Sequence, residues 1–179
     1  MIYIFLANGF EEIEALAVAD ILRRTDASTK LVGIGGKQIS GAHGINFIAD
    51  IAENEANLDE ITGIVLPGGL PGTNNLEASL LVNDAIKLCF NKNLLIAAIC
   101  AAPSILGHMG ILKGKSATCY PGFEKELKNA NVVDSQVCVD GNIITAKGPG
   151  AAIDFGLAVV KYLQGNVFSK KIRAQLQCI

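Results

Sequence analysis

Short, continuously apolar segments alternate with amphipathic, helix-like segments along this chain, and this alternation restricts the fold more than any other feature. IYIFLA (residues 2–7) predicts a first strand, and residues 11–24 predict the helix after it. Further strands are expected at 28–36, 61–69, 94–100 and 115–120, a hairpin at 132–146, and helices at 79–93, 102–110, 148–165 and 168–177. Strands that are apolar at every position are buried on both faces, which is typical of parallel sheets covered by helices.

The pattern therefore predicts an α/β protein with a mostly parallel, doubly wound sheet. No linker, repeat or charge block divides the 179 residues, so we expect one domain over residues 1–179. In the first helix, the stripe expected to face the core is Ile13, Leu16, Ala17, Ile21 and Leu22. In the hairpin, Asp140-Gly141 suits a two-residue turn with positive φ.

Composition argues against several classes of partner. A formal net charge of −2 and the absence of a Lys/Arg cluster make nucleic acid and anionic membranes poor partners. The first apolar segment is too short for a membrane span and lacks a basic leader, so no signal peptide is expected. Five scattered cysteines without a C-x-x-C pair suit reduced thiols in the cytoplasm. His43 and His108 are not spaced to form a metal site with those thiols, and we expect neither a metal nor a cofactor.

Three groups of residues follow three predicted strands. Glu14 lies just after the first, Gly68 and Gly69 follow the third, and Cys100 with Ala101 follows the fourth. The carboxyl ends of parallel strands share one edge of a sheet, where ligand sites gather. We expect these residues to converge there.

Cys100 ends LLIAAIC and precedes a short helix with Pro103 in its first turn. One interpretation is a core thiol, because free cysteine is among the most buried residue types. The other is a nucleophile at a strand-to-helix turn, where helix amides lower the thiol pKa. The pattern alone leaves both open.

Glu14 differs from its neighbours Glu11 and Glu12, which suit the helix dipole as acids of the first turn. Its position is nearer the buried face, where a carboxyl tends to stay protonated and can donate a hydrogen bond. Gly68 and Gly69 are either turn residues or half of an oxyanion hole.

The sequence does not indicate a Cys–His dyad. His108 lies too far along the chain from Cys100 to be its base. His43, in SGAHGIN, is either a solvated loop residue or folds back toward the site.

Five segments together resemble the ThiJ/PfpI superfamily, and within it the branch of the Parkinsonism-associated protein deglycase and its bacterial relatives. They are FLANGFEEIEAL, IVLPGGLPGTNNL, LLIAAICAAPSILG, ATCYPGFE and AKGPGAAIDFGLAVV. The resemblance runs along nearly the whole chain. It implies a flavodoxin-like three-layer sandwich and a homodimer.

By position, Cys100 matches the family's reactive, oxidisable cysteine and Glu14 the protonated carboxyl that contacts its sulfur. Gly69 and Ala101 match the backbone donors around the sulfur, with Gly68 beside them. Pro149 matches the Gly-Pro-Gly segment near the site.

Three positions depart from related proteins. Tyr120 stands where animal members have His, and relatives often carry Arg near the place of His43. Ala101 replaces the His that follows the cysteine in protease relatives, which disfavours a peptidase.

The resemblance and the residues together predict a cysteine-dependent deglycase or glutathione-independent glyoxalase. The expected substrates are methylglyoxal-type α-oxoaldehydes or their adducts on protein side chains. The alternative is a cysteine-based sensor of oxidative stress, or a redox-regulated chaperone, without turnover.

Overall fold

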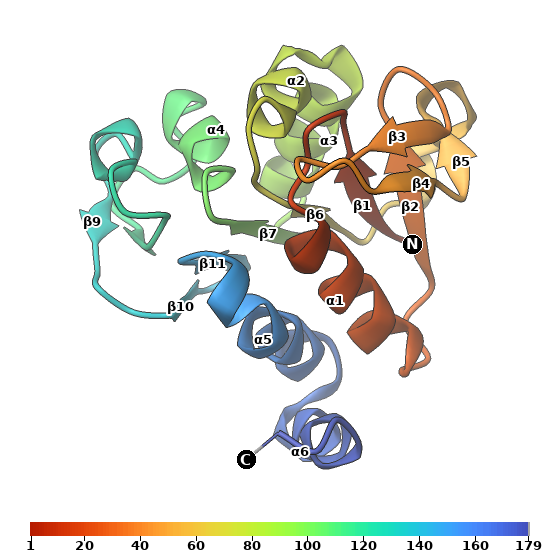
Figure 1. Cartoon of the computed structure of the whole chain (residues 1–179). Helices are drawn as coiled ribbons and strands as arrows, with labels where there is room; N and C mark the ends of the chain where they lie inside the picture. The colour runs from red at the N-terminus through yellow and green to blue at the C-terminus, as the bar shows by residue number, and fades with distance from the viewer. Residues whose placement is uncertain (179) are drawn as a thin grey trace.

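The computed structural model describes residues 1–178 and shows a seven-stranded sheet between two layers of helices (Figure 1). The strand order is β10-β11-β7-β6-β1-β2-β5, and every neighbouring pair is parallel except β10 with β11. The strands are β10 (Val137–Asp140), β11 (Ile143–Ala146), β7 (Leu95–Ile99), β6 (Gly63–Leu66), β1 (Ile2–Leu6), β2 (Thr29–Gly33) and β5 (Ile51–Ala52). The predicted α/β sandwich with a mostly parallel sheet is confirmed.

Helices cover both faces of this sheet (Figure 1). They are α1 (Glu12–Arg23), α5 (Ala152–Gln164) and α6 (Asn166–Gln175) on one side, and α2 (Gly72–Ala78), α3 (Leu80–Asn91) and α4 (Pro103–His108) on the other. In β1, Ile4 and Leu6 pack into the first layer, whereas Tyr3 and Phe5 pack into the second. Successive strand residues point to opposite faces, so a sheet with two helical layers needs the continuously apolar strands seen in the sequence.

The order in which the chain adds strands to the sheet reverses between β1 and β6. The chain runs outward from β1 through β2 to β5, and then returns to the other side of β1 as β6, followed by β7 and β11. In open α/β sheets, ligands bind at the carboxyl ends of the strands beside such a reversal. The residues after β1, β6 and β7 therefore meet at the position where a site is expected.

The buried stripe of α1 differs from the predicted one. Ile13 is 57% exposed, whereas Glu14 has no exposed surface. The helix is rotated relative to the prediction because it packs against α5 as well as the sheet, with Ile21 lying against Gly156 of α5. The prediction assumed a single apolar stripe on the helix, but contacts with both the sheet and α5 determine how α1 is rotated about its axis.

Several local predictions also require correction. The two-residue hairpin loop is Gly141-Asn142, one position later than predicted, because Asp140 still pairs with Ile143. The strand expected at 115–120 is only β8 (Ser116–Ala117), and it pairs with β9 (Asn131–Val132) outside the main sheet. The sequence did not predict α2, β5, or the separate hairpin of β3 (Gln38–Ser40) and β4 (Asn46–Ile48).

Among residues 1–178, no helix combines the length and apolar character needed to cross a lipid bilayer.

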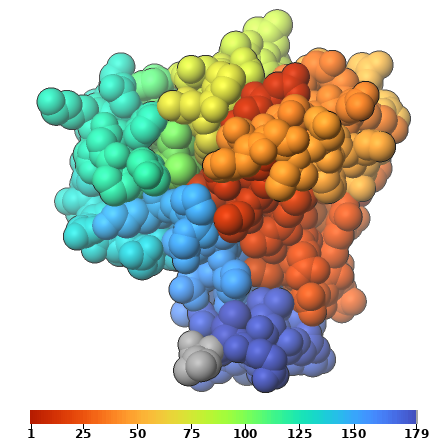
Figure 2. All heavy atoms as spheres, viewed as in Figure 1, coloured from red at the N-terminus to blue at the C-terminus, as the bar shows by residue number. Residues whose placement is uncertain are grey.

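Figure 2 shows α6, in violet, extending from one end of the molecule.

His108 connects three segments on the second face of the sheet. Its Nδ1 lies 2.6 Å from Glu77 Oε1 of α2, and its Nε2 lies 2.8 Å from Glu126 Oε2 of the short 3₁₀ helix Glu124–Glu126. Hydrogen bonds to Glu126 and then Glu77 raise the pKa of His108. The ion pairs stabilise the folded protein fully below the unfolded-state pKa of about 6.5, and this stabilisation is lost as pH rises through the raised folded-state pKa.

We expect His108→Gln to lower the free energy of unfolding by about 1 kcal/mol near pH 6. The loss should be much smaller near pH 9, where the imidazole is already neutral in the wild type. Urea unfolding at both pH values measures this difference. An equal loss at the two pH values would contradict the electrostatic origin.

Candidate functional site

Cys100 occupies a strained turn directly after β7. Its φ is +66°, a conformation that non-glycine residues adopt only when the surroundings enforce it. The Cys100 N–H donates to the carbonyl of Ala146 at 2.9 Å, and its own carbonyl accepts from the Tyr120 N–H at 2.8 Å. These two bonds fix the turn between neighbouring segments. The structure thus places the cysteine at the strand-to-helix turn that the sequence predicted.

Glu14 reaches this turn from the first turn of α1. Its carboxyl is fully buried, and Oε2 accepts a hydrogen bond of 2.7 Å from the Gly68 N–H. The other oxygen, Oε1, is buried and has no hydrogen-bond partner among the described residues. The Cys100 thiol lies beside this carboxyl, so that each group shifts the pKa of the other.

Gly68 lies between Glu14 and Cys100, where only a glycine fits. A Cβ at this position would lie 2.7 Å from Cys100 Cβ and 3.0 Å from Glu14 Oε2. The neighbouring Gly69 has a φ of +86°, and a Cβ there would lie 2.5 Å from the Glu11 nitrogen. The two glycines therefore allow the loop after β6 to approach both the acid and the thiol.

The N–H groups of Gly69 and Ala101 both donate toward the sulfur of Cys100. They come from different loops, one after β6 and one after β7. The structure therefore brings Cys100, Glu14, Gly68, Gly69 and Ala101 together, as expected from their strand-end positions.

Burial determines the proton affinity of both side chains. It raises the pKa of Glu14 to about 7, against the lowering effect of the Gly68 N–H and the thiol. Burial, followed by the charge of Glu14, raises the pKa of Cys100 to about 12, although the Gly69 and Ala101 N–H groups act in the opposite direction. Of the two interpretations that the sequence left open, the nucleophile interpretation invoked helix amides that lower the thiol pKa; here loss of hydration outweighs those amides.

Thiolate and carboxylate are both negative, and their repulsion favours a pair that keeps a single shared proton. A thiol beside a carboxylate and a thiolate beside a carboxylic acid differ only in the position of that proton. Glu14 titrates near neutral pH, so it can accept the thiol proton during an attack by sulfur and return it later.

Tyr120 and Pro149 lie together beside this turn. Both line a cavity of about 180 Å³, whose wall also includes Gly148. Tyr120 is 46% exposed, and its ring packs over Gly148, where a Cβ would lie 3.1 Å from Tyr120 Cδ2. Cys100 does not line this cavity, but Tyr120, which does, donates its N–H to the Cys100 carbonyl.

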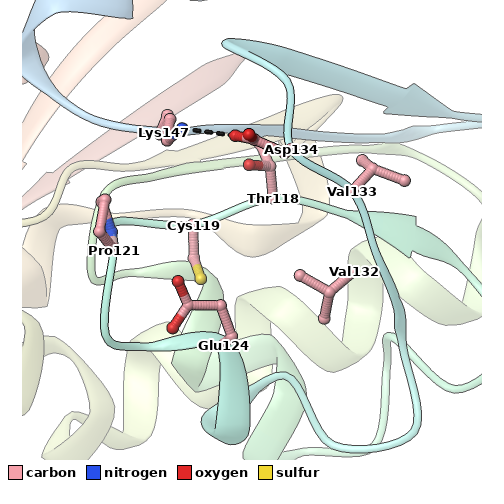
Figure 3. Close-up of a pocket in the computed structure, with 8 residues that line it drawn as sticks. All are labelled: Thr118, Cys119, Pro121, Glu124, Val132, Val133, Asp134 and Lys147. Carbon is pink, nitrogen blue, oxygen red and sulfur yellow. Dashed lines mark hydrogen bonds and ion pairs between the residues drawn. The ribbon is translucent and has the colours of Figure 1, made fainter.

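A larger cavity of about 350 Å³ lies farther along the same surface (Figure 3). The thiol of Cys119 faces the carboxyl of Glu124, and Lys147 Nζ pairs with Asp134 Oδ1 at 2.5 Å. Burial raises the pKa of Cys119 to about 11, so this thiol stays protonated. None of the predicted site residues lines this cavity.

His43 does fold back toward α1, but it reaches Glu12 and Glu11. Its Nδ1 lies 2.9 Å from Glu12 Oε2 and 3.6 Å from Glu11 Oε2. From the sequence, Glu12 was expected to complement the helix dipole, and its contact with His43 was not predicted. His43 and Glu12 are 31 residues apart and no local spacing pattern links them, so only the folded chain reveals the pair.

We expect Gly68→Ala to disrupt the site and lower stability by about 1–3 kcal/mol, the usual cost of overpacking. The added methyl must displace Cys100, Glu14 or the loop itself. Gly150→Ala is the matched control, because no atom lies within 4 Å of its Cβ position. Thermal unfolding and the reaction rate of Cys100 with a thiol reagent measure both effects. Wild-type values for Gly68→Ala would show that the loop has free space.

An α/β sandwich that holds a half-buried cysteine at such a turn belongs to a defined class of proteins, and sequence comparison identifies it. The chain is a member of the DJ-1/PfpI family, which it matches over residues 1–162. This confirms the family predicted from the sequence.

Three relatives illustrate the similarity. Drosophila melanogaster protein dj-1beta is 38% identical over 166 residues, covering 91% of this chain and 89% of that protein. The crystal structure of Drosophila DJ-1beta matches with a TM-score of 0.94 and 35% identity, covering 99% of this chain and 97% of that one. A deglycase of Pyrococcus abyssi is 32% identical over 166 residues, covering 91% of this chain and 99% of the relative. The structure of oxidized Toxoplasma gondii DJ-1 has a TM-score of 0.90 and 32% identity, covering 98% and 97% of the two chains.

Proposed function

We propose that this protein is a cysteine-dependent deglycase or glutathione-independent glyoxalase acting on methylglyoxal-type α-oxoaldehydes or their protein adducts. One observation carries the proposal: the Cys100 sulfur receives two backbone N–H groups and contacts a buried carboxyl that titrates near neutral pH. The Pyrococcus abyssi relative, itself called a deglycase, supports the same activity.

In the first step, the Cys100 sulfur bonds to the aldehyde carbon and its proton passes to Glu14. The aldehyde oxygen becomes an alkoxide, for which the Gly69 and Ala101 N–H groups are the nearest backbone donors. Protonation of this oxygen gives a hemithioacetal. The sharp turn at Cys100 presents the sulfur, while Tyr120 and Pro149 border the adjoining cavity.

Glu14 then moves a proton from the former aldehyde carbon toward the neighbouring ketone. The aldehyde carbon is oxidised to a thioester and the ketone carbon is reduced to an alcohol, so no external redox partner is needed. Water releases lactate and restores the thiol. For a glycated amine or thiol, the aldehyde carbon already carries the side chain, so the Cys100 sulfur displaces it: the new C–S bond forms as the bond to the side-chain nitrogen or sulfur breaks. The leaving atom takes the thiol proton by way of Glu14, and the resulting hemithioacetal follows the same steps.

The test is conversion of methylglyoxal to lactate by purified, reduced protein, with glutathione omitted. Lactate formed in proportion to enzyme concentration, together with dependence on Cys100, supports the proposal. A rate equal to that of buffer would reject it.

A second candidate function is a redox sensor that uses the same thiol. The similarity to an oxidized DJ-1 structure favours this candidate. Peroxide would convert the Cys100 thiol to sulfenic and then sulfinic acid, with release of water at each step. Intact-mass measurement distinguishes it: a gain of two oxygens at Cys100 without aldehyde turnover supports the sensor.

The assembly and compartment are also proposals. We propose a homodimer in the cytoplasm, as the family resemblance and the free cysteines suggest. Light scattering after size exclusion measures the assembly.

A further inference from the structure

A second cluster of ionisable side chains lies where the β3–β4 hairpin crosses the start of α1 (orange over red in Figure 2). It comprises Glu11, Glu12 and His43. One ligand atom from each residue lies within 4.8 Å of the others. The His43 ring nitrogen Nδ1 faces both carboxyl groups at once, at 2.9 Å from Glu12 and 3.6 Å from Glu11.

The Glu11 carboxylate has one positive partner, the His43 ring, which it shares with Glu12. The residue is only 9% exposed, and within residues 1–178 its side chain receives no hydrogen bond. Its nearest cationic atom is His43 Nδ1, beyond hydrogen-bond distance. A buried charge is costly unless it is paired or binds a metal.

The Glu12 carboxylate is already held in place for such a role. Its Oε1 accepts a hydrogen bond of 2.8 Å from the backbone N–H of His43. Gly41 packs so closely that a Cβ there would lie 2.2 Å from this oxygen. Oε2 is therefore directed toward the His43 ring. The hairpin tip fixes two of the three donor atoms before any ion arrives.

We propose that Glu11, Glu12 and His43 form a binding site for a divalent first-row transition metal such as zinc or cobalt. Two carboxylate oxygens and one imidazole nitrogen suit these ions, whereas magnesium prefers oxygen ligands alone. The His43 side chain is 68% exposed, so water can occupy the remaining coordination positions. The metal replaces the Glu12–His43 hydrogen bond, and any proton on Nδ1 passes to solvent.

His108 shows why the arrangement at His43 is distinctive. It also contacts two glutamates, but through its two different ring nitrogens. A metal on one nitrogen would therefore reach only one of those carboxylates, whereas one position beside His43 Nδ1 reaches both.

The experiment is calorimetric titration of Co²⁺ into reduced full-length protein, with its absorption spectrum recorded in parallel. We expect one Co²⁺ per chain and no sulfur-to-metal charge-transfer band. His43→Arg keeps a positive charge beside the glutamates but removes the ligand, and Glu11→Gln removes a carboxylate without breaking a hydrogen bond. Each should weaken binding by at least about tenfold, since loss of an outer-shell partner alone costs about 10–100-fold.

His108→Arg is the matched control and should leave Co²⁺ affinity within about twofold of the wild type. Circular dichroism establishes that each variant is folded, and Glu11→Gln alone decides the matter if His43→Arg does not fold. Absence of stoichiometric binding, unchanged affinity in folded His43→Arg or Glu11→Gln, or a charge-transfer band from cysteine would each overturn the site. Binding is measured directly, so the result is independent of aldehyde turnover at Cys100.

Discussion

Replacement of Cys100 by serine is expected to lower methylglyoxal turnover at least about a thousandfold. A hydroxyl is nearly the size of the thiol, but it is a much weaker nucleophile and holds its proton more tightly. The backbone turn should survive, because its hydrogen bonds to Ala146 and Tyr120 use main-chain atoms. Lactate formation by the variant and the wild type measures the effect.

Cys119→Ser is the matched control for this variant. Cys119 is a buried thiol, whereas Cys100 is half-buried, and its side chain packs in the other core layer, against the second face of the sheet. Its loss should leave turnover within about threefold of the wild type, since no step uses it. Equal activity of the Cys100→Ser variant and the wild type, with contaminating glyoxalases excluded, would refute the covalent route.

Glu14→Gln is expected to lower turnover by about 10²–10⁴-fold while leaving stability equal or higher by up to about 2 kcal/mol. The amide oxygen can still accept from the Gly68 N–H, so the loop position is maintained. The amide cannot exchange a proton with the thiol, which removes general acid–base catalysis. It also removes a buried ionisable group, whose charged form burial disfavours.

Opposite changes in activity and stability are the specific signature of this prediction. Asp20→Asn is the control, because it removes one acid from the exposed side of the same helix. Urea unfolding and lactate formation should both stay near wild-type values in that control. A Glu14→Gln protein that unfolds more easily, or that turns over normally, would contradict the role assigned to the carboxyl.

The general fold and the reactive turn could be predicted from local sequence patterns. Continuous apolar segments specify strands buried on both faces, and the parallel strands bring Glu14, Gly68 and Cys100 to one edge. The rotation of α1 was mispredicted because it depends on packing against α5, which the one-stripe interpretation ignored. Ile13 is exposed for this reason, and the same rotation buries Glu14 completely.

The sequence by itself determined the order of the main strands and helices, the family and the position of the thiol at a strand end, since each depends on neighbours along the chain. Only the tertiary structure decided the proton affinities, because burial by distant segments raises the pKa values of Glu14 and Cys100. It also decided the position of His43, predicted to have no metal role and found between two glutamates 31 and 32 positions earlier in the sequence. That contact exists because the β3–β4 hairpin folds over α1, a long-range packing event that no local pattern encodes.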